Sequence, residues 1–416
     1  MSSTLQRPRI LAIVQAGGAG SRMDVLTRET PKPALPFAGT YRLVDFPLSN
    51  LRNSDITDVW LSVQYLGQHL AEVVANGKPW DLDRHHGGFK LVLPEQGAGS
   101  PAEDGFVNGN AEQLFGLRDA IADHRADAVV VMSADHVYRL NYSDVVDAHL
   151  ARSAECTIVT TEVDLADASH HATVTATKTG TVRRFDYKPD NPSTGVVATE
   201  VFVYSPGPLI EVLESLHRDL STAPDRDTSD PERPSQLGDF GEHLLPALVA
   251  RGRVHAYSLP GYWRDLGRPE TYYAAHTELL DTDTDLFAPD WPITTNTDRN
   301  LPARLEKGSR IINSLIGPGC RIAGTVDRSV LGPGVVVEAG ARVADSIVHA
   351  DVIVAAGATV HAAIIDTGCR IGTDARVGPS RRRTHAPNLT LLGRDCQVAA
   401  GHTVDPGARL EPGTTA

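Results

Sequence analysis

The chain has 416 residues, enough for two domains with a sizeable buried core. Lys and Arg number 39 and Asp and Glu number 52, giving a formal net charge of −13, which argues against a protein that wraps nucleic acid. The four cysteines form no CxxC pair, so neither a zinc clamp nor a disulfide scaffold is indicated. The apolar run Ile10–Val14 is too short for a signal peptide or a membrane span, and we expect a cytoplasmic protein with no membrane partner.

Up to about residue 280, short apolar runs alternate with segments of helical periodicity. Ile10–Val14 and Val129–Met132 have the length and composition of strands buried on both faces of a parallel sheet. An amphipathic stretch, Ala111–Ala122, lies between them. This alternation predicts an α/β domain over residues 1–280.

Three segments poor in apolar residues interrupt this pattern. Two are predicted loops, the glycine-rich Gln96–Gly109 and the polar Arg218–Leu237. The third begins with the Asp-, Thr- and Pro-rich stretch Asp281–Asn300, and we predict a linker over residues 281–310.

The last part of the chain, residues 311–416, carries a six-residue repeat of branched apolar residues. The sets are Ile316 and Ile322; Leu331, Val337 and Val343; Val348, Val354 and Val360; and Ile365, Ile371 and Val377. The last three sets begin 17 residues apart. A six-residue period is typical of short parallel strands stacked in a three-sided coil, with one branched residue of each side pointing inward. We therefore predict a left-handed parallel β-helix.

A glycine-rich segment follows the first predicted strand directly. Its sequence AGGAGSR, residues 16–22, contains Gly17, Gly18 and Gly20. Glycines there let backbone amides approach a triphosphate, and the start of a following helix adds a favourable dipole. The pattern is neither the Walker GxxxxGK[ST] nor GxGxxG, and glycines after a strand also suit a simple tight turn.

The segment PKPALPF follows at a short distance and contains Lys32. Together with AGGAGSRM it resembles the signature of sugar nucleotidyltransferases. Arg22 and Lys32 would then neutralise the β- and γ-phosphates that leave as pyrophosphate. The alternative for each side chain is a solvated surface cation.

Two aspartates stand in segments that the same resemblance makes metal-binding. VMSADHVY ends an apolar strand with Asp135, and the carboxyl ends of parallel strands are where such sheets bind ligands. GYWRDLG resembles the family's GYWRDVGT and contains Asp265. Two such carboxylates suit a Mg²⁺ ion whose coordination is completed by phosphate oxygens. The resemblance therefore implies that Asp135 and Asp265 bind Mg²⁺ and that Asp135 is catalytic. The alternative for an aspartate after a strand is a turn or helix-cap residue.

Other segments are similar to parts of the family that bind substrate. LPEQ, ending in Gln96, resembles the stretch that faces the nucleotide base, and Gly109 lies in a stretch that matches the family's WYxGTADA. RFDYKP matches FxEKP, whose lysine holds the phosphate of the sugar 1-phosphate, so the resemblance assigns that role to Lys188. Surface positions in loops are the alternative for Gln96 and Lys188.

The segment YRLVDFPLSN, residues 41–50, resembles the ADP-glucose pyrophosphorylase branch of the family. The resemblance spans nearly the whole chain. It implies a Rossmann-like, mostly parallel sheet in the nucleotidyltransferase domain, followed by the β-helix. It also implies synthesis of ADP-glucose and pyrophosphate from ATP and glucose 1-phosphate for glycogen or α-glucan formation, in an allosterically controlled homotetramer. Arg381–Arg383 are candidates for an anionic effector site, with a solvated basic turn as the alternative.

The sequence departs from this family mainly on the side of the sugar. Tyr187 stands where the family has a Glu that hydrogen-bonds sugar hydroxyls, and Glu200 stands in place of a Gly. Two alternatives therefore stay open: a nucleotidyltransferase for another sugar 1-phosphate or nucleotide, and a low-activity regulatory paralogue. A third, an acyltransferase, would use a histidine of the coil as its base, with His349 and His361 as the candidates.

Overall fold

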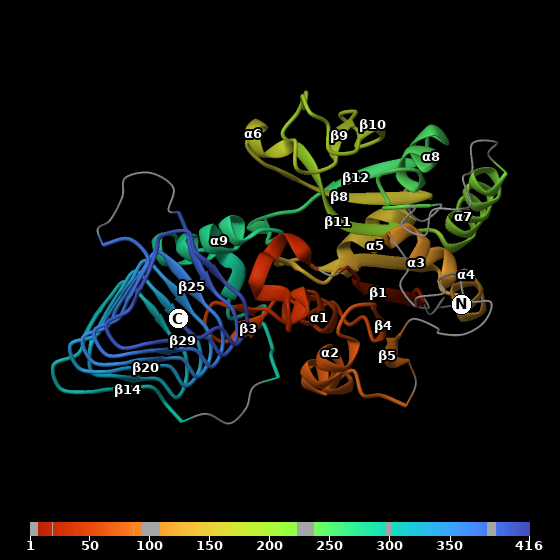
Figure 1. Ribbon diagram of the computed structural model, residues 1–416. Helices are drawn as coiled ribbons and strands as arrows, with labels where there is room; N and C mark the ends of the chain where they lie inside the picture. Colours follow the sequence, from red (N-terminus) through yellow and green to blue (C-terminus); the bar gives the residue numbers. More distant parts are fainter. Residues whose placement is uncertain are drawn as a thin grey trace.

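The computed structural model describes most of the chain as two parts, an α/β part and a coil of short strands (Figure 1). The described residues are 7–18, 20–85, 87–93, 109–222, 237–296, 301–380 and 388–416. No helix among them is long and apolar enough to cross a membrane.

The α/β part is built on a nine-stranded sheet with β1 near its centre. The order is β10-β9-β11-β6-β1-β4-β5, and β8 pairs with β11 and β12. The strands are β1 (Ile10–Ala16), β4 (Asp58–Val63), β5 (Gly88–Val92), β6 (Ala128–Ser133), β8 (Cys156–Glu162), β9 (Thr173–Ala176), β10 (Val182–Asp186), β11 (Val196–Tyr204) and β12 (Val254–Ser258). β1 runs parallel to both β4 and β6, and β11 is antiparallel to β6 and β8. The strands predicted at Ile10–Val14 and Val129–Met132 are confirmed as β1 and β6.

Helices cover both faces of this sheet, which explains why its central strands are mostly apolar. Leu11 and Ile13 of β1 pack with α3, α4, α7 and α8, whereas Ala12 and Val14 pack on the opposite face with α1, α2 and α5. The helices are α1 (Asp45–Asn53), α2 (Gly67–Val74), α3 (Asn110–Gly116), α4 (Arg118–His124), α5 (Tyr142–Ala151), α6 (Leu165–Ala168), α7 (Pro206–Ser221), α8 (Leu244–Ala250) and α9 (Pro269–Asp281).

Two helical segments differ from their predictions. The stretch Ala111–Ala122 forms two helices, α3 and α4, with a break at Leu117. The loop predicted from Arg218 to Leu237 is wrong at its beginning, because α7 continues to Ser221. Leu216 and Leu220 continue the helical apolar stripe of α7 and pack against the core, so the helix extends past Arg218.

The coil has three parallel sheets of six two- or three-residue strands, as a β-helix requires (Figure 1). Its strands are β14 (Arg304–Leu305), β15 (Arg310–Ile312), β16 (Leu315–Ile316), β17 (Arg321–Ile322), β18 (Thr325–Asp327), β19 (Val330–Leu331), β20 (Val336–Val337), β21 (Arg342–Ala344), β22 (Ile347–Val348), β23 (Ile353–Val354), β24 (Thr359–His361), β25 (Ala363–Ile365), β26 (Arg370–Ile371), β27 (Arg376–Val377), β28 (Thr390–Leu392), β29 (Gln397–Val398), β30 (Thr403–Val404) and β31 (Arg409–Leu410). Leu331, Val348 and Ile365, the residues 17 apart, stack in register and are buried. The six-residue repeat is therefore the interior of the coil, as predicted.

The segment after α9 packs back on the α/β part before the coil begins. Trp291 Nε1 donates to Asn50 Oδ1 at 2.8 Å, and Thr294 N donates to Ser49 Oγ at 2.9 Å. The short 3-10 helix Asp285–Phe287 also lies here, with Leu286 buried. β14 lies before residue 311, so the first coil strand falls inside the stretch predicted as linker.

An apolar interface joins the coil to the α/β part. It contains Phe37, Tyr272, Ile347 and Ile364, all buried. The Tyr272 hydroxyl donates to the Pro36 carbonyl and lies 3.0 Å from His349 Nε2 of the coil. The coil therefore holds α9 and the segment around Pro36 in fixed positions.

Asp45, at the start of α1, is a buried carboxylic acid whose titration provides a test of the fold. Its Oδ2 accepts a hydrogen bond from the Arg42 amide at 2.7 Å. Burial raises the pKa of the Asp45 carboxyl to about 7, against about 3.9 in an unfolded chain. The folded state keeps this proton longer than the unfolded state, so the free energy of unfolding falls as pH rises from about 4 to 7.

We expect Asp45→Asn to remove this dependence. Between pH 5 and pH 8 the wild type should lose about 2–3 kcal/mol more stability than the variant does. Urea unfolding of both proteins at the two pH values measures the difference. Parallel changes in the two proteins would contradict the assignment.

Candidate active site

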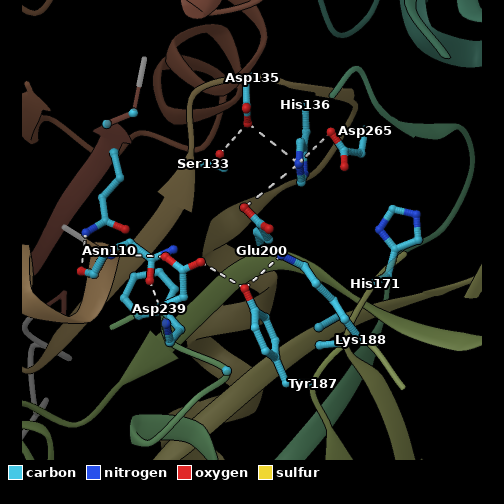
Figure 2. A pocket seen from close by; sticks show the side chains of 18 of the residues that line it. Asn110, Ser133, Asp135, His136, His171, Tyr187, Lys188, Glu200, Asp239 and Asp265 are labelled. Carbon is cyan, nitrogen blue, oxygen red and sulfur yellow. Dashed lines mark hydrogen bonds and ion pairs between the residues drawn. The ribbon is translucent and has the colours of Figure 1, made fainter. Parts of the chain in front are cut away.

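A cavity of about 520 Å³ opens at the carboxyl ends of β1 and β6, the edge of the sheet where the glycine-rich segment begins. Gly17, Gly18, Arg22 and Lys32 line it. Tyr187 and Lys188 lie opposite Asp135 and Asp265, with Glu200 between the two pairs (Figure 2). Segments from residue 17 to residue 265 therefore converge on one site.

The glycine segment forms a close-fitting wall. A Cβ added to Gly17 would lie 2.3 Å from Gln113 Nε2, so a larger residue would displace the α3 side chain. Gly18 has φ of +92° and Gly20 has φ of +62°, values that glycine adopts readily. The short 3-10 helix Ser21–Thr27 follows, and its Arg22 is exposed at the cavity. Gly20 does not itself line the cavity, and a Cβ added to it would lie 3.2 Å from the Lys32 Cβ and 3.3 Å from Thr27 Cγ2.

Strand pairing explains how Asp135 and Asp265 come together. Asp135 lies two residues after the end of β6 and directly before β7 (His136–Tyr138), which pairs with β13 (Trp263–Asp265) in a separate two-stranded sheet. In that antiparallel register Asp265 lies opposite His136. The carboxylate at the end of β13 is thus placed beside the carboxylate at the end of β6.

Lys32 lies between the two aspartates. Its Nζ is 2.5 Å from Asp135 Oδ2 and 3.7 Å from Asp265 Oδ1, and the lysine side chain is only 10% exposed. Burial alone would lower the pKa of Lys32, but the two carboxylates outweigh it and raise that pKa. Burial likewise acts to raise the pKa values of Asp135 and Asp265, yet Lys32 and His136 hold both below their usual range. All three groups are charged at neutral pH.

His136 is a site residue that the sequence reasoning did not select. Its Nδ1 lies 3.0 Å from the Thr199 carbonyl, and its Nε2 faces Asp265 at 3.5 Å and Asp135 at 3.6 Å. Burial opposes the charged form, but the carboxylates, led by Asp265, raise the pKa of His136 to about 9. The sequence offers one signal for His136, which is its position directly after Asp135 at the start of the next strand.

The opposite wall combines an amphipathic tyrosine with a lysine and two acids (Figure 2). The Tyr187 hydroxyl donates to Asp239 Oδ2 at 2.8 Å and accepts from Lys188 Nζ at 2.8 Å. Glu200 Oε2 is 3.9 Å from His136 Nε2. Burial raises the pKa of Glu200; His136 counteracts this, whereas Asp135 and Asp265 add to it.

The donor groups fit a hard divalent cation. Asp135 and Asp265 offer carboxylate oxygens, the ligands that Mg²⁺ prefers, and leave room for phosphate oxygens. The ammonium group of Lys32 already lies between them, which shows that this position attracts a cation. Asp135, His136 and Glu200 also bring one ligand atom each to within 4.8 Å of one another.

The predicted site residues are thus largely gathered in one place. Arg22, Lys32, Asp135, Lys188 and Asp265 all line the cavity. Gly17, Gly18 and Gly109 line it as well. Gln96 and the candidate effector residues Arg381–Arg383 lie outside the described residues.

The two coil histidines have structural partners. His349 is buried, with Nδ1 2.9 Å from Asp366 Oδ1 and Nε2 3.0 Å from the Tyr272 hydroxyl. His361 Nδ1 lies 2.8 Å from the Pro379 carbonyl, and Nε2 lies 3.4 Å from Asp345. Both rings are engaged within the chain, which disfavours the acyltransferase alternative.

Comparison with known proteins agrees with this geometry. Residues 11–282 match the family described as nucleotidyl transferase, and residues 301–387 match the family described as GlmU-like, C-terminal hexapeptide. The chain is therefore a member of the nucleotidyl transferase family, with a hexapeptide coil appended.

Individual relatives show more closely which group of nucleotidyl transferases the chain belongs to. A protein from Acetivibrio thermocellus, named glucose-1-phosphate adenylyltransferase, is 31% identical over 99% of this chain and 95% of its own length. A protein of the same name from Desulfitobacterium hafniense is 30% identical over 99% of this chain and all of its own length. A third, from Thermotoga neapolitana, is 34% identical over 80% of this chain and 76% of its own length. The chain belongs to the glucose-1-phosphate adenylyltransferase family.

The Lys32 arrangement leads to a prediction about metal binding. Replacing Lys32 by Gln leaves Asp135 and Asp265 without their central cation, so the free energy of unfolding should fall by about 2–4 kcal/mol in the absence of metal. Because the ammonium group no longer competes for the carboxylates, Mg²⁺ should raise the melting temperature more in this variant than in the wild type.

Thermal unfolding in EDTA and in Mg²⁺ measures both effects. Lys178→Gln is the matched control, since Lys178 is exposed and does not line the cavity. An equal rise in melting temperature with Mg²⁺ in the wild type and in Lys32→Gln would rule out competition between the ammonium group and the metal.

Proposed function

We propose that this protein transfers the adenylyl group of ATP to glucose 1-phosphate, giving ADP-glucose and pyrophosphate for α-glucan synthesis. The observation that carries the proposal is the Lys32 ammonium between Asp135 and Asp265 beside the glycine wall. A triphosphate needs this combination of cations, backbone amides and metal-binding carboxylates. The names of the full-length relatives supply the substrates.

The reaction needs orientation and charge neutralisation, with no covalent enzyme intermediate. An oxygen of the sugar phosphate forms a bond to the α-phosphorus of ATP. The bond from that phosphorus to the oxygen bridging to the β-phosphorus breaks, and pyrophosphate leaves with that electron pair. The attacking phosphate oxygen is already ionised, so no general base is required.

The residues divide between the two substrates. Gly17 and Gly18 accommodate the triphosphate along the backbone, while Arg22 and Lys32 neutralise the charge of the departing pyrophosphate. Asp135 and Asp265 would hold Mg²⁺, which when bound polarises the phosphates. Lys188 holds the phosphate of the sugar substrate from the opposite wall.

Three further residues complete the proposed set. Gly20 leaves room for Lys32, because a Cβ there would lie 3.2 Å from the Lys32 Cβ. Gly109 lines the cavity where α3 begins, and a side chain there would meet the Gly238 carbonyl. We assign reading of the adenine edge to Gln96, whose amide offers both a donor and an acceptor.

The presence of Glu200 supports a second candidate function, which is transfer of the adenylyl group to another sugar 1-phosphate. Its carboxylate stands in the cavity between the aspartates and Lys188, where a sugar ring would lie (Figure 2). The chemistry at the phosphates would be the same, and only the sugar would differ. A low-activity regulatory paralogue is the alternative that absence of turnover would favour.

We further propose a cytoplasmic homotetramer with an anionic effector, as in the family. The four free cysteines are all buried and suit a reducing compartment. Leu301 and Leu305, at the start of the coil, are 79% and 58% exposed and are candidates for a contact between subunits.

The central test is pyrophosphate release. Purified protein with Mg²⁺, glucose 1-phosphate and each of ATP, GTP, UTP, CTP and dTTP should release pyrophosphate with ATP. Asp135→Asn should lower kcat about 100-fold or more, because it removes a negative charge at the metal. Asp123→Asn, an exposed position of α4, should retain wild-type activity. Pyrophosphate release with a different nucleotide would rule out adenine as the base. No release with any nucleotide, sugar phosphate or activator tried would rule out the proposed enzymatic activity.

Lys188 provides a test of the sugar-phosphate side. Loss of a charge-assisted bond to phosphate should raise KM for the sugar phosphate roughly tenfold or more in Lys188→Ala, with KM for ATP changed much less. Steady-state kinetics with each substrate varied in turn separates the two. Lys178→Ala serves as the control, and an equal rise in both KM values would place Lys188 elsewhere in the site.

A further inference from the structure

Glu200 is held in an unfavourable backbone conformation within β11. Its φ is +56°, a left-handed value that non-glycine residues rarely adopt. The register between β11 and β8 shifts between Ala198 and Phe202, so the strand alternation is broken around Glu200. Strain of this kind is retained mainly where it positions a functional group. Here it directs the carboxylate into the cavity, toward His136 (Figure 2).

The Glu200 carboxylate accepts no hydrogen bond from any residue in the described part of the chain. The nearest cation is His136 Nε2 at 3.9 Å, which lies closer to Asp265 and Asp135. The Glu200 side chain is 46% exposed, in contrast to 10% for Lys32. The carboxylate is therefore open to a ligand that enters the cavity.

The two lysines of the cavity are engaged elsewhere. Lys32 is paired with Asp135, and Lys188 donates to the Tyr187 hydroxyl. In nucleotidyl transfer these lysines face phosphates, so neither is free to neutralise Glu200. A second carboxylate, Asp239, stands on the same wall as Tyr187. The wall facing the sugar ring therefore carries more negative than positive charge.

Resting on the proposed nucleotidyl transfer, we infer that Glu200 is a specificity-determining residue that binds the ammonium group of an amino-sugar 1-phosphate. A carboxylate without a hydrogen-bond donor, close to two further carboxylates, is satisfied best by a cationic group. The enzyme accepts such a sugar alongside glucose 1-phosphate, and Glu200 provides the selectivity between them. The ammonium group keeps its protons. The bonds formed and broken are those given above for glucose 1-phosphate.

The test compares two sugars in one assay. Pyrophosphate release is measured with ATP, Mg²⁺ and either glucosamine 1-phosphate or glucose 1-phosphate, for the wild type and Glu200→Gln. The ratio of kcat/KM for the amino sugar to kcat/KM for glucose 1-phosphate should fall roughly tenfold or more in Glu200→Gln, because a charge-assisted hydrogen bond is lost. N-acetylglucosamine 1-phosphate, which has no ammonium group, should show no such dependence on residue 200.

A matched control comes from the neighbouring strand. Glu162 ends β8, is exposed and does not line the cavity, so Glu162→Gln should leave the ratio unchanged. The half-saturating Mg²⁺ concentration and the melting temperature are measured for each variant. They show whether Glu200→Gln alters metal binding or folding instead of sugar choice.

The outcomes separate the inference from the function on which it rests. Turnover of glucose 1-phosphate without turnover of glucosamine 1-phosphate, or an unchanged ratio in Glu200→Gln, overturns the inference and leaves adenylyl transfer standing. A shift in Mg²⁺ dependence with no change in the ratio also overturns it, making Glu200 a metal ligand. Absence of pyrophosphate release with every sugar phosphate overturns both.

Discussion

The ion pairs of Lys32 with Asp135 and Asp265 are the interaction on which the rest of the site depends. Two partly buried carboxylates next to each other repel, and a cation close by favours the ionised form of both. The lysine provides that cation from a segment more than 100 residues before the first aspartate. The three segments are thus held at the cavity by charge as well as by the packing of their strands.

The coil supports the same arrangement from the other side. Tyr272 of α9 contacts His349 of the coil and donates to the carbonyl of Pro36, four residues after Lys32. Phe37, the next residue, lies in the apolar interface with Ile347 and Ile364 of the coil. The segment that carries Lys32 is therefore held partly by packing between the two parts of the chain, with the coil as a support.

The sequence predicts features that repeat or that lie next to a strand end. The six-residue spacing identified residues such as Val337 and Val354 that are fully buried in the coil, because the period of the side chains follows directly from the period of the backbone. Asp135 could be placed at the carboxyl edge of the sheet because it follows β6. Asp265 and Lys188 had no such local signal, and their selection came from resemblance to a family.

Features that depend on tertiary contacts could not be predicted in this way. The last turn of α7, residues 218–221, is helical because Leu220 packs on the core, although the local composition is polar. The segment after α9 contains too little apolar surface to suggest packing, yet Trp291 and Thr294 bond to α1. The direction of the Glu200 side chain follows from a register shift between β11 and β8, which composition does not reveal.

Charge balance connects His136 to the choice of substrate. Three carboxylates, Asp135, Asp265 and Glu200, surround two cations, Lys32 and the imidazolium of His136, so the centre of the cavity is negative by one charge. A divalent metal on the two aspartates reverses that sign, which favours the triphosphate. Glu200 lies beyond the aspartates, toward Lys188, and keeps a negative charge near the sugar position even when the phosphate side has become positive. In the proposed complex the phosphate of the sugar substrate is attracted by Lys188 and by the metal side, whereas Glu200, which lies between them, attracts an ammonium group on the sugar ring.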